Sequence, residues 1–179
     1  SLKKPPYQAG APDPEAVQLA GEMTAPVSFQ AASMEDRAYH ALMRQGRADD
    51  AEQFLRGVLQ RAPEHREANF HLGRHLFDFG RLDESIAPLQ QTLKVWPENH
   101  GARGRLGFAL CALKHGQAAE KIVTEGLQYD SLYLHFVLGA ISVTNGNRTL
   151  ASQHLGVVAQ QAPETPGLRE LVEQLKGMQ

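Results

Sequence analysis

His71 and His75 are the residues whose type and spacing come nearest to a metal-binding motif. They lie four residues apart on a predicted helix, with His65 a short distance upstream, and two imidazoles at that spacing can chelate a metal ion. The residues between them are leucine, glycine and arginine, so the glutamate of a zincin helix is absent. His75 is expected to face a paired helix, where a hydrogen-bonded packing role is commoner. We therefore predict no metal site and no cofactor.

Cys111 is the single cysteine of the chain. A reactive thiol needs nearby positive charge, and only Lys114 and His115 are close in sequence, so an inert, partly buried thiol is expected. The sequence shows no phosphate loop, no nucleophile elbow and no convergent pair of carboxylates. These observations predict that the chain is not an enzyme.

The composition is that of a globular protein. The chain has 179 residues, 42% of them hydrophobic and 21% charged, with a net charge of -2. There is no basic block of the kind that binds phosphate backbones, so nucleic acid is not an expected partner. No apolar run approaches the roughly 20 residues that span a bilayer, so no direct membrane insertion is expected. A single cysteine fits the cytoplasm, with the periplasm or a partner-mediated membrane association as alternatives.

A motif recurs along most of the chain with a period of about 34 residues. It consists of a Leu-Gly pair, a second glycine seven residues later, a small residue, a leucine and a closing proline. The clearest copies contain Leu72, Gly73, Gly80, Ser85, Leu89 and Pro97, and Leu138, Gly139, Gly146, Ala151, Leu155 and Pro163. Each copy is interpreted as helix A, a turn and helix B, over 32–65, 66–99, 100–131 and 132–165. The glycine after each leucine lets helix B approach closely.

These repeats resemble the tetratricopeptide repeat family. The resemblance implies an all-α fold, a right-handed superhelical solenoid of stacked antiparallel helix pairs. Residues 166–179 are expected to form a C-terminal capping helix that covers the last apolar face. Residues 1–31 are rich in proline and alanine and are expected to be a partly flexible leader with room for one short helix.

Several positions depart from the pattern. Tyr39 stands where the other copies have a small residue, so the first repeat is expected to pack differently. The third copy has Lys114 where the others have glycine, lacks the closing proline and is two residues short, which predicts irregular stacking after it. Pro88 falls inside a helix B and removes one backbone hydrogen bond there.

In proteins of this family, the face of helix A turned away from helix B lines a concave groove. Carried onto this chain, the predicted groove residues are His40, Met43, Arg44, Phe70, Arg74, Phe77, Phe108, Cys111, Tyr133, Phe136, Ala140 and Val143. The aromatic row suits an apolar or amphipathic segment of a partner. Coverage by the leader or a second subunit, and plain core packing, are the alternatives. The clamp that grips chaperone tails in some members is disfavoured, because Asp36, His40 and His71 replace its residues.

The resemblance implies a protein-interaction adaptor or scaffold, of a kind common in bacterial machinery. Its expected partner is a protein or peptide, and self-association is a further expectation. The alternatives are a secretion-type chaperone for an apolar client and the accessory repeat module of a larger enzyme.

Overall fold

The computed structural model describes residues 33–178. The leader predicted at 1–31 lies outside the described residues. The described part contains helices only, without strands, and its elements are α2 (Met34–Arg44), α3 (Ala48–Arg61), α4 (Arg66–Asp78), α5 (Leu82–Val95), α6 (His100–Ala112), α7 (Gly116–Thr124), η1 (Leu127–Tyr129), α8 (Leu132–Thr144), α9 (Arg148–Gln161) and α10 (Leu168–Gly177). None of the described helices is long and apolar enough to cross a bilayer.

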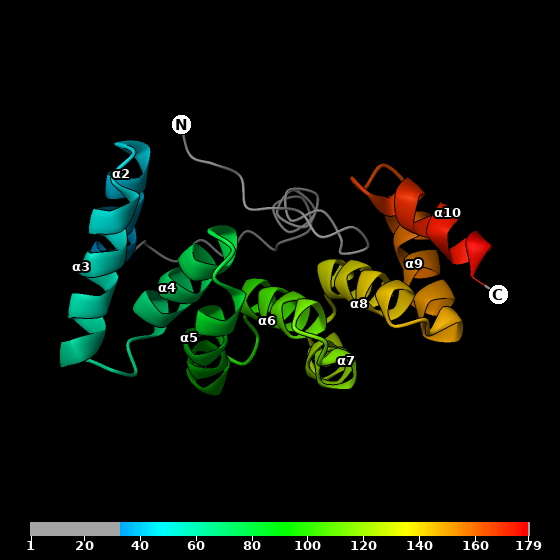
Figure 1. Cartoon of the computed structure of the whole chain (residues 1–179), viewed down its shortest axis with the longest axis horizontal. Coiled ribbons are helices and arrows are strands. Elements are labelled where there is room, and N and C mark those ends of the chain that lie inside the picture. The colour runs from blue at the N-terminus through cyan, green and yellow to red at the C-terminus, as the bar shows by residue number, and fades with distance from the viewer. Residues whose placement is uncertain (1–32, 179) are drawn as a thin grey trace.

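The helices pair into four successive antiparallel hairpins, α2–α3, α4–α5, α6–α7 and α8–α9, followed by α10. The first helices of neighbouring hairpins also contact one another, α2 with α4, α4 with α6 and α6 with α8. Figure 1 shows the hairpins as a row that rises at both ends, with α2 and α3 at one end and α10 at the other. This all-α solenoid confirms the fold class that the repeat predicts.

Three glycines allow the two helices of a hairpin to touch. A Cβ on Gly73 would lie 2.7 Å from Leu89 Cγ and 3.1 Å from the Leu89 backbone nitrogen. A Cβ on Gly139 would lie 2.5 Å from Leu155 Cδ2, and one on Gly107 would clash with a side chain of α7. The steric reason inferred for the Leu-Gly pair is therefore confirmed, because a larger residue at these positions would wedge the helices apart.

The turns between the paired helices need a left-handed backbone. Gly46, Gly80 and Gly146 have φ of 71°, 76° and 76°, and Lys114 takes the equivalent place with φ of 68°. The third hairpin thus keeps the same turn geometry although its sequence lacks the glycine. Gly116, two residues later, begins α7, and a Cβ there would lie 2.7 Å from Asn145 Cγ.

The third hairpin is the irregular one, as its missing proline predicts. Helix α7 ends at Thr124, the short η1 follows, and Asp130 takes a left-handed φ of 50° before α8 begins. Arg103 fills the space that this irregular stretch leaves. Its guanidinium donates to the carbonyls of Ile122 and Pro97, each at 2.8 Å. Burial lowers the pKa of Arg103, which is only 5% exposed. Besides the two carbonyls, Glu125 Oε2 lies 3.9 Å from its Nη1.

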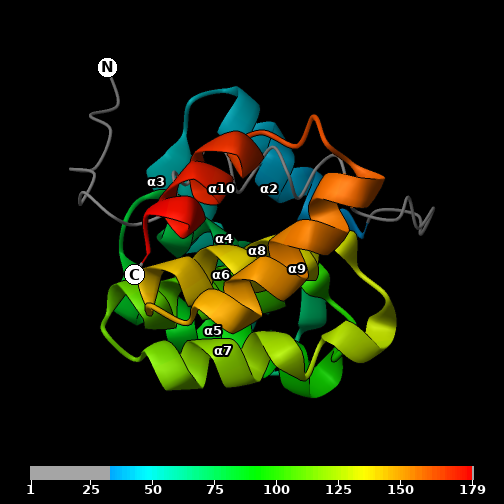
Figure 2. The ribbon, with the colours of Figure 1, turned by 90° about the vertical axis from the view of Figure 1, so that its right-hand side faces the viewer.

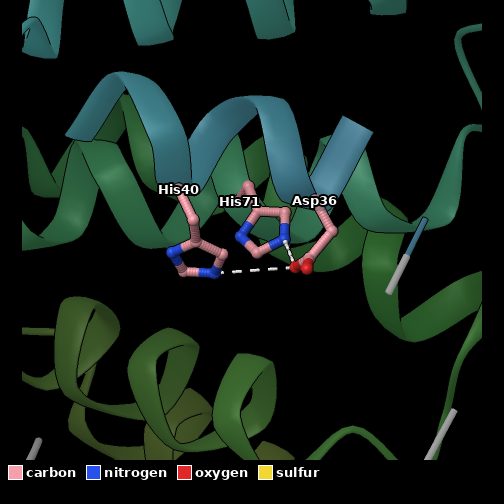
Figure 3. A group of neighbouring side chains, drawn as sticks. All are labelled: Asp36, His40 and His71. Atoms are coloured by element: carbon pink, nitrogen blue, oxygen red, sulfur yellow. Dashed lines mark hydrogen bonds and ion pairs between the residues drawn. The ribbon is translucent and has the colours of Figure 1, made fainter. Parts of the chain in front are cut away.

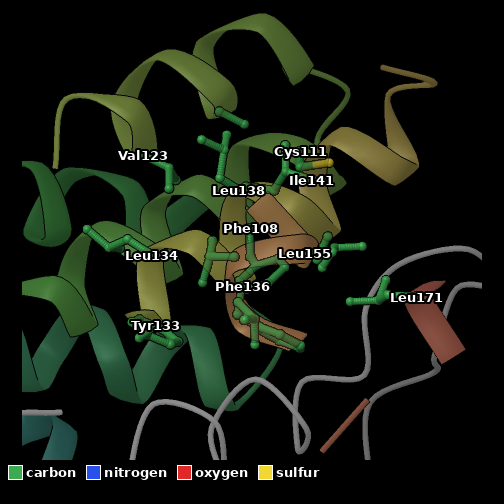
Figure 4. Close-up of a cluster of buried hydrophobic side chains, with 14 of the residues drawn as sticks. Phe108, Cys111, Val123, Tyr133, Leu134, Phe136, Leu138, Ile141, Leu155 and Leu171 are labelled. Atoms are coloured by element: carbon green, nitrogen blue, oxygen red, sulfur yellow. The ribbon is translucent and has the colours of Figure 1, made fainter. Parts of the chain in front are cut away.

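The core consists of three clusters strung along the solenoid. The first hairpin and α4 share one cluster around Leu55 and Leu76, and α5 and α6 share a second around Leu89 and Leu106. The largest cluster extends from α4 through α6, α7, α8 and α9 to α10 (Figure 4). Leu168 and Leu171 of α10 are buried against it, and Figure 2 shows α10 beside α9 at this end. The last helix therefore covers an apolar face that would otherwise be exposed.

Candidate functional site

The candidate surface is the row of twelve residues predicted on the first helix of each hairpin, which we call the A-helix row. The structure divides this row into two halves. Six members are buried: Phe77, Phe108, Cys111, Tyr133, Phe136 and Ala140. The other six are partly or fully exposed: His40, Met43, Arg44, Phe70, Arg74 and Val143.

The buried half departs from the open groove that the sequence predicts. These six residues belong to the large core cluster, and Phe136 is 1% exposed. One reason is that neighbouring first helices pack side by side, so residues between them are enclosed laterally as well as from helix B. Tyr133 shows the contact directly, because its ring lies over Gly104, where a Cβ would come within 2.6 Å of the ring carbon Cζ. In this structure, the six residues contribute packing and little accessible surface.

Cys111 is part of this buried half. Burial raises the pKa of its thiol, and Sγ lies 3.8 Å from Asn145 Oδ1. A thiol with a raised pKa is mostly protonated at neutral pH and is a poor nucleophile. The structure therefore agrees with an inert, buried cysteine.

The exposed half gathers on the first two hairpins. His40, Met43 and Arg44 lie on α2, and Phe70 and Arg74 lie on α4, the next helix of the row. Only Val143 belongs to the other end of the molecule, where it packs against the core cluster from α8. The accessible part of the A-helix row is thus a mixed apolar and basic surface.

Phe70 is set in an aromatic neighbourhood. Its ring centroid lies 5.4 Å from that of His71 and 6.1 Å from that of Trp96, and the Arg66 guanidinium sits 4.6 Å from the Trp96 ring. These contacts hold Phe70 in place while leaving part of it accessible. An aromatic ring that is both partly exposed and supported from behind can anchor an apolar side chain of a partner.

The charges beside Phe70 come from α4 itself and from α6. Arg74 Nε lies 3.4 Å from Asp78 Oδ2, and Arg105 Nε of α6 lies 3.8 Å from Asp78 Oδ1. Two arginines therefore share one aspartate on this face. The Arg105 side chain is 12% exposed and also donates to the Gly101 carbonyl at 3.2 Å.

His71 and His75 do not face a common position. His71 Nε2 lies 2.7 Å from Asp36 Oδ1 of α2, whereas His75 Nε2 lies 3.7 Å from Glu52 Oε2 of α3. Tyr39 is buried between the hairpins, and its ring stacks on His71 at 4.7 Å between centroids. The aromatic side chain at this small-residue position is therefore accommodated by the imidazoles of α4.

What sequence reasoning missed is the convergence of Asp36, His40 and His71 (Figure 3). Asp36 and His40 are one turn apart on α2, and His71 approaches them from α4. The sequence gives part of this information, because all three residues occupy the positions that correspond to the chaperone-tail clamp. Their mutual approach depends on how the first two hairpins stack, which the spacing along the chain does not give.

A shallow cavity of about 340 Å³ lies elsewhere, lined by Gly116, Gln117, Glu120, Asn145 and Asn147. Two of these residues pair with each other, since Asn145 Nδ2 donates to Glu120 Oε1 at 3.0 Å. The lining presents amides and one carboxylate, which is not a combination that activates a nucleophile.

Comparison with known proteins identifies the repeats. Residues 40–100 match the model of the tetratricopeptide repeat family, which spans part of the first hairpin and all of the second. No curated protein sequence matches the chain significantly. Residues 40–100 therefore match tetratricopeptide repeats in sequence, and the later hairpins have the same helical arrangement.

Solved structures show the same fold over most of the chain. A crystal structure of MamA is 20% identical, with a TM-score of 0.66, and the match covers 82% of this chain and 93% of MamA. MamA from Desulfovibrio magneticus RS-1 is 15% identical over 83% of this chain and 95% of that one, with a TM-score of 0.63. A tetratricopeptide repeat protein from Parabacteroides merdae ATCC 43184 is 16% identical, with a TM-score of 0.70, over 92% of this chain and 64% of that one. The chain thus has the fold of a tetratricopeptide-repeat solenoid.

Proposed function

We propose that this protein is a non-enzymatic interaction scaffold that binds an apolar or amphipathic segment of a partner protein along the A-helix row. Solenoids of stacked helix pairs create extended concave surfaces that serve for binding. The observation that carries the proposal is the exposed half of the row on α2 and α4, where a supported aromatic ring is flanked by arginines.

The exposed half of the A-helix row limits which residues can contact the partner segment. We infer that an apolar side chain of the partner packs on Phe70 and Met43, and that acidic residues of the same segment meet Arg44 and Arg74. An amphipathic helix laid across a groove presents anchors in this way, with charged positions at its edges. The buried half of the row would then support the helices from within and make no direct contact with the partner.

A chaperone role is the alternative with less support. A chaperone for an apolar client would need a large accessible apolar surface, and most of the aromatic residues in the row are buried. Only Met34 and Val95 are exposed large hydrophobic residues within the described part of the chain. A scaffold that uses a small mixed surface fits these observations better.

Position-specific photocrosslinking tests the proposal. A photoreactive amino acid at Met43 of α2 is compared with one at Gln90, an exposed position on the second helix of the next hairpin. The proposal expects one partner to crosslink from Met43 and not from Gln90, and expects Arg74→Glu to weaken that crosslink. Equal crosslinking from both positions, or from Gln90 alone, would show that the binding surface lies elsewhere.

A further inference from the structure

We propose that Asp36, His40 and His71 form a binding site for a divalent transition-metal ion, which joins the first two repeats. Among residues 33–178, this is the group of His, Cys, Asp and Glu side chains whose ligand atoms all lie within 4.8 Å of one another. The group combines two imidazoles with one carboxylate, the donor set that suits ions such as Zn²⁺.

The side chains point toward one another from two helices. Figure 3 shows Asp36 and His40 descending from α2 and His71 reaching the same place from behind. His40 Nε2 lies 3.6 Å from Asp36 Oδ1, and His71 Nε2 lies 2.7 Å from the same oxygen. Two ligands of a tetrahedral ion with bonds of about 2.1 Å are about 3.4 Å apart. The first distance fits such an ion, and the second must lengthen by about 0.7 Å.

The required movement is small and falls on a side chain that can make it. Asp36 is on the first turn of α2, and its side chain is 25% exposed, so its carboxylate can rotate away from His71. His71 is fixed, because its side chain is 4% exposed and its ring stacks on Tyr39. His40 is 39% exposed and gives an ion access from solvent. One rigid ligand and two adjustable ones therefore surround the position.

The surroundings also limit the strength of binding. His71 Nδ1 is buried and has no hydrogen-bond partner, whereas ligating imidazoles usually donate from the second nitrogen to an acceptor that orients them. Arg74, three residues beyond His71, adds positive charge nearby. We therefore expect a dissociation constant in the micromolar range, weaker than that of a structural zinc site.

Three protein ligands leave at least one coordination position open. His40 belongs to the exposed half of the A-helix row, so that position can take water or a donor atom from a bound segment. An ion here would also connect α2 to α4. These helices otherwise meet through the hydrogen bond between His71 and Asp36 and through the buried Tyr39 with its aromatic neighbours.

The competing explanation is an ordinary hydrogen bond from His71 Nε2 to Asp36, without any ion. The two explanations separate in the variant Asp36→Asn, because the amide oxygen still accepts that hydrogen bond but is a poor metal ligand. They also separate in His40→Gln, because His40 lies 3.6 Å from the carboxylate on an exposed part of α2 and contributes little to the core. His154→Gln is the matched control, since His154 contacts another histidine, His135, at 2.8 Å on the far hairpin.

The test titrates Zn²⁺ into the untagged full chain by calorimetry and records the visible spectrum with Co²⁺. The wild type is expected to bind one Zn²⁺ and to give Co²⁺ absorption typical of nitrogen and oxygen ligands. Asp36→Asn and His40→Gln should each weaken Zn²⁺ binding at least about tenfold, while His154→Gln binds as the wild type does. Thermal unfolding without metal should be nearly unchanged in His40→Gln. The proposal is overturned if the wild type binds no Zn²⁺, if His40→Gln binds equally well, or if binding is lost in His154→Gln.

Discussion

Replacing Lys114 with glycine should stabilise the protein, although it removes a complete side chain. Lys114 occupies a left-handed backbone conformation, with φ of 68°, at the turn between α6 and α7. A residue with a Cβ pays about 1–2 kcal/mol for that conformation, and glycine does not. Glycine loses more freedom on folding, which offsets about 0.5–1 kcal/mol. The expected net gain is therefore about 0.5–1 kcal/mol, or about 1–4 °C in melting temperature for a chain of this size.

Two further variants control for the size of the side chain. Gly146 has φ of 76° and no atom within 4 Å of an added Cβ, so Gly146→Ala should lower the melting temperature for conformational reasons alone. Gly57 also has open space around its Cβ but lies within α3 with ordinary φ, so Gly57→Ala should raise the melting temperature slightly. The assay is thermal unfolding of the full chain, followed by circular dichroism. A lower melting temperature for Lys114→Gly would refute the equivalence of the four turns.

Three other perturbations test packing, surface and pH. Gly73→Leu should cost about 1–3 kcal/mol in unfolding experiments, because the new side chain meets the backbone of α5; an unchanged denaturation midpoint would contradict the close approach. Phe136→Ala should destabilise by about 3–5 kcal/mol. Phe70→Ala should destabilise clearly less, because Phe70 is only partly buried, and should weaken partner binding in a pulldown; equal effects on stability would contradict the division of the row. Burial lowers the pKa of both His135 and His154, and their Nδ1 atoms lie 2.8 Å apart. Stability from this pair should be present above pH of about 6.5 and fall as pH drops through the lowered pKa values, since the unfolded chain then binds more protons; unfolding titrations should show a weaker pH dependence in His154→Gln.

The repeat architecture could be predicted because its causes are local. The Leu-Gly pair, the turn glycine and the closing proline act within one hairpin. The close helix contacts predicted at Gly73 and Gly139 are therefore found in the structure. The irregular third hairpin was also predictable from its missing proline. Helix α7 ends without that proline, and the chain continues through η1 and the left-handed Asp130 to α8.

The division of the A-helix row could not be predicted in the same way. Helical spacing places Phe77, Phe108 and Phe136 on one stripe, but the lateral approach of α4, α6 and α8 decides how much of that stripe is enclosed. The packing of the Tyr133 ring of α8 over Gly104 of α6 is one such lateral contact. These contacts join residues of different repeats, so no spacing within a single copy reveals them.

The candidate metal site could not be predicted from the sequence for the same reason. The expectation of no metal ion rested on His71 and His75, which the structure separates toward Asp36 and Glu52. The group that does converge combines residues of α2 and α4. Only the stacking of the first two hairpins brings these side chains together.

Hydrogen–deuterium exchange tests the central claim most directly, namely that a partner segment binds along the first helices of the solenoid. The segment identified by crosslinking from Met43 is added to the full chain, and the change in exchange is measured helix by helix. The account predicts slower exchange in α2 and α4, with no change in α5 and α7. Slower exchange confined to α5, α7 and α9 would contradict it, because the binding surface would then lie on the second helices.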